Sequence, residues 1–204
     1  NWFGETLFAT PLLRLLREQR PHAHLATLGW PACREMLLHN PRINEILEYD
    51  ERGIHRSLPA KGRLIAALRA QRFDAALILR KSLSRSLLLA MAGIPMRIGF
   101  ANPKSGWLLT HRVPPSPVAM HKASTDLLLL EAVGLLTAAV PYEYVVSEEE
   151  RRAARQRLAE RHALDGHPLI ILHPGANWRH KRWAPQRFAA LGDRLAQHYQ
   201  AQIA

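Results

Sequence analysis

The segment of residues 173–183 carries residue types that can bind a phosphate or a diphosphate. It reads H-P-G-A-N-W-R-H-K-R-W and lies between an apolar run typical of a buried strand and an amphipathic run typical of a helix. At such a junction in an α/β sheet, Pro-Gly lets the backbone approach a ligand closely, and the next helix presents free N–H groups. Arg179, Lys181 and Arg182 add cations. The same residues also fit a solvated basic loop whose tryptophans cover the core, and neither the G-x-x-x-x-G-K-S/T nor the G-x-G-x-x-G phosphate motif is present.

Two further segments place charged side chains next to predicted helices. Gly4 and Glu5 stand at the start of a helical run, where the carboxylate can act as a general base or can complement the dipole of the helix. Residues 80–85, R-K-S-L-S-R, follow an apolar strand and put three cations and two hydroxyls at its carboxyl end. This second set suits an anionic substrate, and it suits a solvated helix N-terminus equally well.

The elements that must position these segments alternate between short extended runs and longer amphipathic runs. This alternation is typical of a doubly wound parallel sheet, so we predict an α/β fold with a Rossmann-like sheet. The run over 74–79 is apolar enough for a strand buried on both faces, and the apolar helix over 121–135 is interpreted as core packing. Helices are predicted over residues 7–18, 31–39, 61–71, 82–92 and 121–135, and strands over 24–28, 43–49, 74–79, 97–100 and 108–113.

A second domain is predicted to begin at residue 141, which gives domains over 1–140 and 141–204. Ser147 followed by three glutamates is typical of a capped helix start. One β-loop-α element cannot bury its strand on both faces, so we expect this domain to continue beyond Ala204. Its predicted elements are a helix over 147–162, a strand over 169–172 and a helix over 185–199.

Composition places the chain among globular proteins. Its 204 residues are 48% hydrophobic and 22% charged, which excludes a disordered, collagen-like or coiled-coil chain. There are 28 Lys and Arg against 17 Asp and Glu, a formal charge of +11, so an anionic ligand, a membrane surface or a nucleic acid is the expected kind of partner. The single cysteine, Cys33, excludes an internal disulfide framework, and the 11 histidines show no metal-ligand spacing, so no metal is expected.

The chain shows neither a membrane-spanning nor a secretory pattern. No run reaches the ~18 to 20 apolar residues that a bilayer span requires. Residues 1–10 have no basic head before their apolar residues, as a signal peptide would have. Because the first residue is not Met, we expect the sequence to be a fragment of a longer protein.

Five ordered blocks carry a resemblance to a known family: N-W-F-G-E-T-L-F-A-T-P-L-L at 1–13, N-P-R-I-N-E-I at 40–46, residues 82–100, L-L-T-H-R-V-P at 108–114 and H-P-G-A-N-W-R-H-K-R-W at 173–183. They resemble glycosyltransferase family 9, the heptosyltransferases of bacterial lipopolysaccharide core synthesis. Together they span nearly the whole chain. Glu5 departs from the family pattern, which has aspartate there; the extra methylene moves the carboxylate by about 1 Å, a shift that can cost ~100-fold in rate unless the backbone compensates.

The resemblance implies a GT-B-type fold, in which two Rossmann-like domains face each other across a cleft. This chain would then hold the first domain without its opening strand, and the beginning of the second. The resemblance also implies an inverting transfer of heptose from ADP-heptose, which needs a base for the acceptor hydroxyl and positive charge for the departing diphosphate. By this comparison Glu5 is the base. The implied donor diphosphate site is Gly175, Ala176, Asn177, Lys181 and Arg182.

The family's acceptor is the phosphorylated inner core of lipopolysaccharide at the cytoplasmic face of the inner membrane. The resemblance therefore implies a cytoplasmic protein in peripheral contact with an anionic membrane, with a nucleotide sugar as substrate and no cofactor. The implied candidate acceptor contacts are Arg80, Lys81, Arg85, Arg97 and Lys104, which we expect near loops at the ligand edge of the sheet.

Two alternatives stay open. One is a GT-B glycosyltransferase with another donor or acceptor, because sugar selection lies partly outside this chain. The other is a basic nucleic-acid-binding domain. Against the latter, the cations are spread along the chain and no zinc-finger or RNP pattern is present, so no nucleic acid partner is expected. We expect the fragment alone to be inactive.

Overall fold

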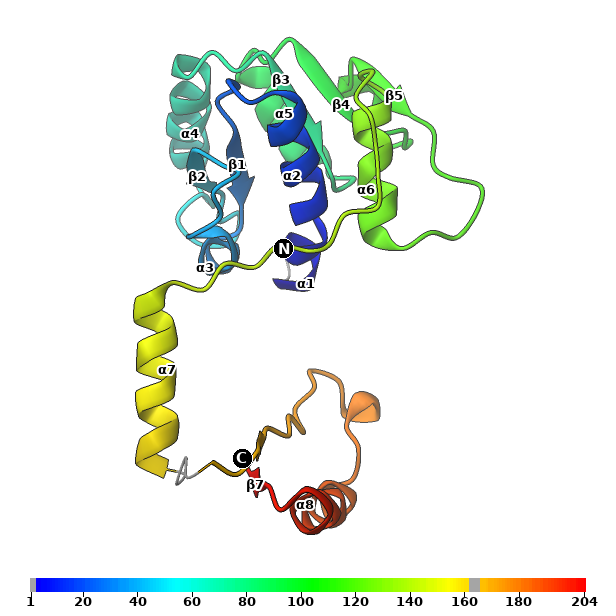
Figure 1. Ribbon diagram of the computed structural model, residues 1–204. Helices are drawn as coiled ribbons and strands as arrows, with labels where there is room; N and C mark the ends of the chain where they lie inside the picture. The colour runs from blue at the N-terminus through cyan, green and yellow to red at the C-terminus, as the bar shows by residue number, and fades with distance from the viewer. Residues whose placement is uncertain (1–2, 162–165) are drawn as a thin grey trace. The chain divides into compact units, whose positions relative to one another are not determined.

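The computed structural model describes residues 3–161 and 166–204. The chain divides into two compact units, Asn1–Val145 and Val146–Ala204, and each is described by itself. Figure 1 shows the two units in sequence colours, with unit 1 running from blue to green and unit 2 from yellow to red.

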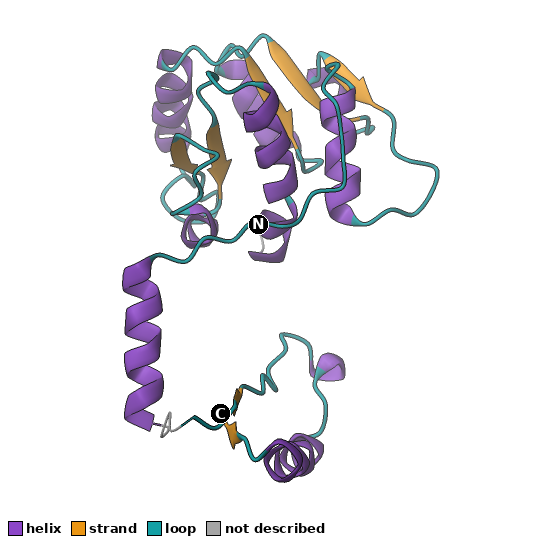
Figure 2. Ribbon diagram, in the orientation of Figure 1, coloured by secondary structure: helices purple, strands orange, loops and turns teal. Residues whose placement is uncertain are grey.

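Unit 1 contains two parallel sheets. Strands β1 (Ala26–Gly29) and β2 (Glu45–Glu48) pair with each other, with Ala26 opposite Glu45. The second sheet has the order β3-β4-β5, made of β3 (Ala75–Ile78), β4 (Met96–Phe100) and β5 (His111–Val113). Every pairing is parallel, and each strand is separated from the next by helical turns (Figure 2). The parallel α/β architecture predicted from the alternation of elements is confirmed.

Helices cover the two faces of these strands. On one face, α2 (Thr10–Gln19) packs against α6 (Lys122–Glu131), and their leucines form one core cluster with Ile46 and Leu77 of the strands. On the other face, α4 (Leu58–Ala70) packs against α5 (Leu83–Met91), and a second cluster joins Leu68 and Leu88 to strand residues. The same two helical layers thus enclose both sheets.

Local signals explain where several helices begin and end. Ser57 caps α4 by accepting a hydrogen bond from the Ala60 N–H at 3.3 Å, with Pro59 in the first turn. His121 caps α6 in the same way, through Nδ1 to the Ala123 N–H. After α5 the chain turns at Gly93, whose φ of +80° is a conformation that favours glycine.

Some predicted elements differ from those observed. The single helix predicted over 7–18 is two helices, α1 (Phe3–Phe8) and α2, and the helix over 31–39 is a 3-10 turn, η1 (Pro31–Cys33), followed by the short α3 (Arg34–Leu37). The strand predicted over 108–113 begins only at His111, because residues before it form the 3-10 turn η2 (Gly106–Leu108). Strand β3 is an edge strand of its sheet, and only its carboxyl end is buried, so the prediction of a strand buried on both faces holds for Ile78 and not for Ala75.

The core role predicted for the helix over 121–135 is confirmed. Leu129 and Leu130 are both fully buried, and they face two different core clusters. The helix ends earlier than predicted, at Glu131, and Gly134 follows with a φ of +74°. Its apolar residues therefore hold unit 1 together.

Unit 2 contains α7 (Glu148–Arg161), β6 (Leu169–Ile170), η3 (Arg179–Lys181), α8 (Pro185–Tyr199) and β7 (Gln202–Ile203). The predicted cap of α7 is confirmed: the Glu150 N–H donates to Ser147 Oγ at 3.1 Å, and the Ser147 N–H donates to a Glu150 carboxylate oxygen at 2.8 Å. Residue 162, the predicted end of this helix, lies outside the described residues. Strand β7 pairs in parallel with β6 and was not predicted.

The core of unit 2 is small. Among its described residues only Gly192 is buried, and Ile171 after β6 is 65% exposed. Ile203 of β7 and Leu172 pack on α8 at Gly192, where an added Cβ would lie 3.5 Å from each of them. This agrees with the expectation that one β-loop-α element has little core of its own.

Candidate functional site

A cavity of about 450 Å³ lies at the carboxyl edge of the β3-β4-β5 sheet, and we call it the cationic pocket. The carboxyl ends of parallel strands meet at one edge of a sheet, and the loops that follow them build ligand sites there. Residues 79–81 follow β3, Phe100 ends β4, the loop after β5 contributes three residues, and α6 contributes two from its first turn. The lining residues are Leu79, Arg80, Lys81, Phe100, Pro115, Ser116, Val118, Lys122 and Thr125.

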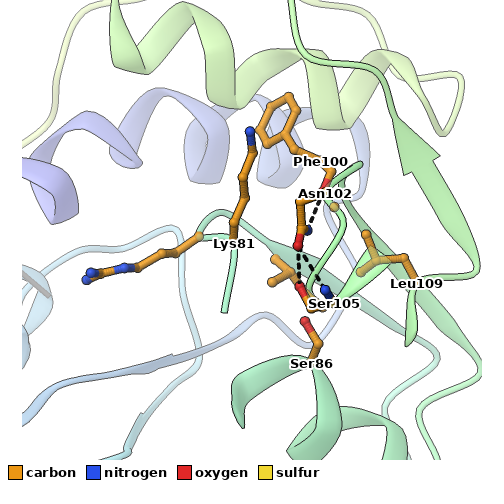
Figure 3. Close-up of a pocket in the computed structure, with 9 residues that line it drawn as sticks. Lys81, Ser86, Phe100, Asn102, Ser105 and Leu109 are labelled. Atoms are coloured by element: carbon orange, nitrogen blue, oxygen red, sulfur yellow. Dashed lines mark hydrogen bonds between the residues drawn. The ribbon is translucent and has the colours of Figure 1, made fainter. Parts of the chain in front are cut away.

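A smaller pocket beside it shares Arg80, Lys81 and Phe100 and has a fixed polar floor. Asn102 donates to the Phe100 carbonyl at 3.0 Å, and its Oδ1 accepts from both the N–H and the hydroxyl of Ser105 at 2.9 and 3.0 Å. Figure 3 shows these bonds, with the Lys81 side chain extending toward Phe100. The network holds the turn after β4 in one shape, so it positions the end of that strand.

Close backbone packing supports the same edge. A Cβ added at Gly99 of β4 would lie 3.1 Å from a Leu109 methyl group and 3.3 Å from Ile78 Cβ. A larger residue at position 99 would therefore be crowded by Ile78 of β3 and by the segment before β5, and glycine avoids this. The sequence signal for the turn was the Asn-Pro pair at residues 102–103, which is typical of turn initiation.

The cation at Lys122 is held by a buried carboxylate. Lys122 donates a hydrogen bond to Oδ1 of Asp126, one helical turn further along α6. Asp126 is fully buried, and its Oδ2 has no hydrogen-bond partner among residues 3–161 and 166–204. Burial raises the pKa of Asp126, the hydrogen bond and charge of Lys122 lower it, and the charge of Glu5 raises it further. Sequence reasoning missed this pair; its signal was a Lys and an Asp at i and i+4 inside an apolar helix.

Glu5 lies in the first turn of α1, and its field reaches the same edge of unit 1. Burial lowers the pKa of Arg85, and the charge of Arg80 lowers it further, whereas Glu51, Tyr49 and Glu5 act in the opposite direction. Arg85 is half-buried on α5, and Arg80 and Lys81 are exposed just before that helix. The charges of Glu5 and Arg80 thus both act on Arg85, and Arg80 lines the cationic pocket together with Lys81.

Arg97 lies elsewhere, at the amino-terminal end of β4. Its Nε donates to the Leu108 carbonyl at 2.7 Å and its Nη1 donates to the Ile94 carbonyl. Residue 97 is the second residue of a strand that starts at Met96, so its side chain is far along the strand from Phe100. The prediction that Arg97 lies at the ligand edge is therefore wrong, because its guanidinium fastens the loops at the opposite edge. Lys104 is exposed in the turn after β4.

In unit 2, all five predicted diphosphate contacts lie in the one loop between β6 and α8. Arg182 Nε donates to the Ala176 carbonyl at 2.7 Å, which closes the loop on itself, and Lys181 ends η3. A Cβ at Gly175 would lie 3.1 Å from the His173 ring, so glycine permits the close fold of the backbone there. The N-cap of α8 is Ala184, which has no polar side chain to cap the first-turn N–H groups. Lys181, Arg182 and Asn177 are exposed.

The two tryptophans of this loop differ in their contacts. Trp183 packs edge-on against Phe188 of α8 with ring centroids 5.3 Å apart. Trp178 is 64% exposed and stacks on His180 at 6.1 Å. One tryptophan therefore anchors the loop to the helix, and the other is left at the surface.

The family described as glycosyltransferase family 9 (heptosyltransferase) matches residues 61–204, which is more than half of the chain and includes the loop just described. This chain belongs to glycosyltransferase family 9. The resemblance predicted from the five sequence blocks is confirmed.

Relatives of this family 9 chain include two named heptosyltransferases. It is 28% identical over 100 residues to lipopolysaccharide heptosyltransferase 2 of Escherichia coli (strain K12) and, to the same extent, to that of Salmonella typhimurium (strain LT2). Each match covers 49% of this chain and 29% of the relative. The matched stretch therefore spans less than a third of the relatives' length.

Solved structures share the fold of the family 9 chain. A family 9 glycosyltransferase from Veillonella parvula superposes with a TM-score of 0.89 at 22% identity, and ADP-heptose lps heptosyltransferase II of E. coli with 0.78 at 23%. E. coli heptosyltransferase WaaC with ADP gives 0.73 at 12%. All three cover 100% of this chain, which spans 60 to 63% of theirs. The predicted GT-B-type α/β fold class is confirmed.

The described ranges show neither a membrane-spanning helix nor a cluster of metal ligands. No described helix is both long and apolar enough to cross a bilayer. Across residues 3–161 and 166–204, no three His, Cys, Asp or Glu side chains gather where they could hold a metal ion.

Proposed function

We propose that the full-length protein transfers heptose from ADP-heptose to the inner core of lipopolysaccharide, with inversion at the sugar carbon. The observation that carries this proposal is the cationic pocket at the carboxyl edge of unit 1, in a chain of family 9. The charge of Glu5 acts on Asp126, which pairs with Lys122 in the lining of that pocket. The relatives named as lipopolysaccharide heptosyltransferases support the choice of sugar and acceptor.

Two opposite charges do the chemistry. Glu5 removes the proton of the acceptor hydroxyl as its oxygen attacks the sugar carbon, and the bond from that carbon to the diphosphate oxygen breaks. Lys181 and Arg182 stabilise the negative charge that develops on the departing diphosphate, and Asn177 and the backbone at Gly175 and Ala176 orient it. The Arg182 bond to the Ala176 carbonyl supports this role because it holds Arg182 and the backbone at Ala176 in a fixed arrangement.

Unit 1 binds the acceptor in the same proposal. Arg80, Lys81 and Lys122 line the cationic pocket, and Ser116 and Thr125 add hydroxyl donors for phosphate or carboxylate oxygens. Arg85 adds a fourth cation near Glu5. The Arg97 side chain takes no part, because it binds backbone carbonyls at the other edge. We place the protein at the cytoplasmic face of an anionic membrane, where such an acceptor is anchored.

The test is a transfer assay on the full-length protein. Purified enzyme is given ADP-heptose or other nucleotide sugars, together with a lipopolysaccharide precursor that lacks its outer residues. We expect transfer from ADP-heptose. Glu5→Gln should lower kcat by about 10²- to 10⁴-fold, the usual contribution of a general base. The matched control is Glu18→Gln, on exposed α2 surface, which should leave kcat unchanged.

Two outcomes would overturn parts of the proposal. Transfer from another nucleotide sugar alone would replace the donor and keep the reaction class. A Glu5→Gln enzyme that turns over as fast as the wild type would remove Glu5 from the role of base.

A further inference from the structure

A long stretch of unit 1 contains cations and no acids. Between Asp74 and Asp126 the sequence has no Asp or Glu, whereas it has seven Lys and Arg residues. This stretch forms β3, α5, β4, η2, β5 and the start of α6. The stretch itself therefore supplies only positive charge, although Glu5 and Glu51 act on Arg85 and Asp126 pairs with Lys122.

The same stretch exposes a stripe of large apolar side chains on α5. Leu83, Leu87 and Met91 are spaced four residues apart, so they lie along one side of the helix, and they are 47%, 42% and 50% exposed. On the two flanks of this stripe, Ser86 and Leu88 of α5 are buried. Packing of unit 1 therefore does not account for the stripe.

Trp107 extends this apolar surface. It is 65% exposed on η2, and η2 contacts α5. We call the surface made by Leu83, Leu87, Met91 and Trp107 the α5–η2 face. Tryptophan at the edge of an apolar patch is typical of proteins that lie at a membrane–water interface.

Exposed cations surround the α5–η2 face. Arg80 and Lys81 stand just before Leu83 at the start of α5. At the other end, the guanidinium of exposed Arg69 donates to the Met91 carbonyl. Lys104 precedes η2 and is also exposed. An apolar stripe between cations, with no carboxylate in the surrounding stretch, complements anionic lipid headgroups above acyl chains.

We propose that the α5–η2 face docks on an anionic membrane surface. The inference rests on the proposed function in that it names the surface by which this enzyme reaches a membrane-anchored acceptor. Lys81 belongs both to the rim of this face and to the lining of the cationic pocket. Docking therefore brings the pocket to the level of the headgroups. A protein partner fits less well, because a protein surface offers both signs of charge and this stretch supplies only one.

Vesicle co-sedimentation of the full chain tests the surface directly. Vesicles of phosphatidylcholine with phosphatidylglycerol are compared with pure phosphatidylcholine vesicles. We expect binding to the anionic vesicles, and we expect Leu87→Gln with Trp107→Gln to lower the partition coefficient by about tenfold or more. The matched control is Leu58→Gln with Leu136→Gln, which removes two apolar side chains that are 81% and 80% exposed outside the stretch. The control should bind like the wild type.

Salt dependence separates the electrostatic contribution to vesicle binding from the apolar contribution. Raising the ionic strength from about 0.1 M to about 1 M shortens the Debye length from about 10 Å to about 3 Å and should weaken binding strongly.

The four substituted positions, 87 and 107 in the variant and 58 and 136 in the control, are all exposed. We therefore expect the unfolding midpoints to match that of the wild type, which would show that the variants fold.

Three results would overturn the docking surface. The first is that the Leu87–Trp107 variant binds anionic vesicles as well as the wild type does, and the second is that the wild type binds neutral and anionic vesicles equally. The third is that the wild type self-associates and the variant does not, while their vesicle binding is the same. Transfer to a deacylated, soluble acceptor is measured in parallel. If the wild type transfers heptose and the variant still binds vesicles like the wild type, the docking surface is refuted and the enzymatic proposal stands. If the variant loses vesicle binding but neither the wild type nor the variant transfers heptose, the enzymatic proposal is refuted and the docking surface stands.

Discussion

Lys122→Met removes one of the two opposite charges that pair beside the cationic pocket. The substitution keeps an apolar stem of similar length and removes the ammonium that donates to Asp126. Asp126 is 0% exposed, so its carboxylate would then be buried without a counter-ion. Removing one partner of a buried ion pair costs about 3–5 kcal/mol. Because the Lys122 side chain is 37% exposed, solvent screens part of the attraction, and we expect a loss of about 2–3 kcal/mol at neutral pH.

The loss should depend on pH in a defined direction. Burial already raises the pKa of Asp126 in the folded protein, and removing Lys122 takes away the two effects that lower it. In the variant the folded state binds this proton more readily than the unfolded state, so the free energy of unfolding falls as pH rises through the raised pKa. The deficit is therefore larger at neutral pH than at acid pH, and it disappears below the pKa of the unfolded chain, where both states hold the proton.

Urea unfolding followed by circular dichroism measures this effect at neutral and at acid pH, with Cm compared at constant m. Lys122→Met combined with Asp126→Asn should recover most of the lost stability, because no charge is then buried. The control is Lys104→Met, at an exposed turn, which should change stability by less than about 0.5 kcal/mol. If the variant is as stable as the wild type at neutral pH, or if its deficit is the same at every pH, Lys122 does not compensate a buried carboxylate.

Four further substitutions, one of them with a matched control, follow from packing and position. Leu130→Ala should lower the free energy of unfolding, measured in urea, by about 3–4 kcal/mol. Of this, about 2.4 kcal/mol comes from the loss of three buried carbons and the remainder from the cavity left behind. As the control, Leu136→Ala at an 80% exposed position should change the free energy of unfolding by less than about 0.5 kcal/mol. Arg97→Ala should lower stability by about 2 kcal/mol and leave the acceptor KM unchanged, whereas Arg80→Ala should raise that KM about three- to tenfold at constant stability. Gly93→Ala should cost about 1–2 kcal/mol by thermal unfolding, because its φ is +80°.

Short-range patterns in the sequence were enough for most of the elements and for the position of the loop over 173–183. Ser147 and Glu150 cap α7 as predicted, and the apolar helix over 121–135 supplies core leucines. The loop of residues 173–183 lies between a strand and a helix, as its flanking runs indicated. These features depend on hydrogen bonds and periodicities within a few residues, which every chain of this sequence carries whatever its tertiary packing.

Long-range packing decided which charges meet. The predicted strands already put Arg97 at the start of one strand and Arg80 after the end of another, but only the parallel pairing of β3 and β4 sets the two residues at opposite edges of one sheet. The burial of Asp126 against the core, and hence its dependence on Lys122, likewise arises only when α6 packs on the sheet and on α2. Burial and electrostatic environment depend on residues that are far apart in the chain. Residue type and spacing therefore determined which chemical groups are available, and the fold determined which of these groups act together.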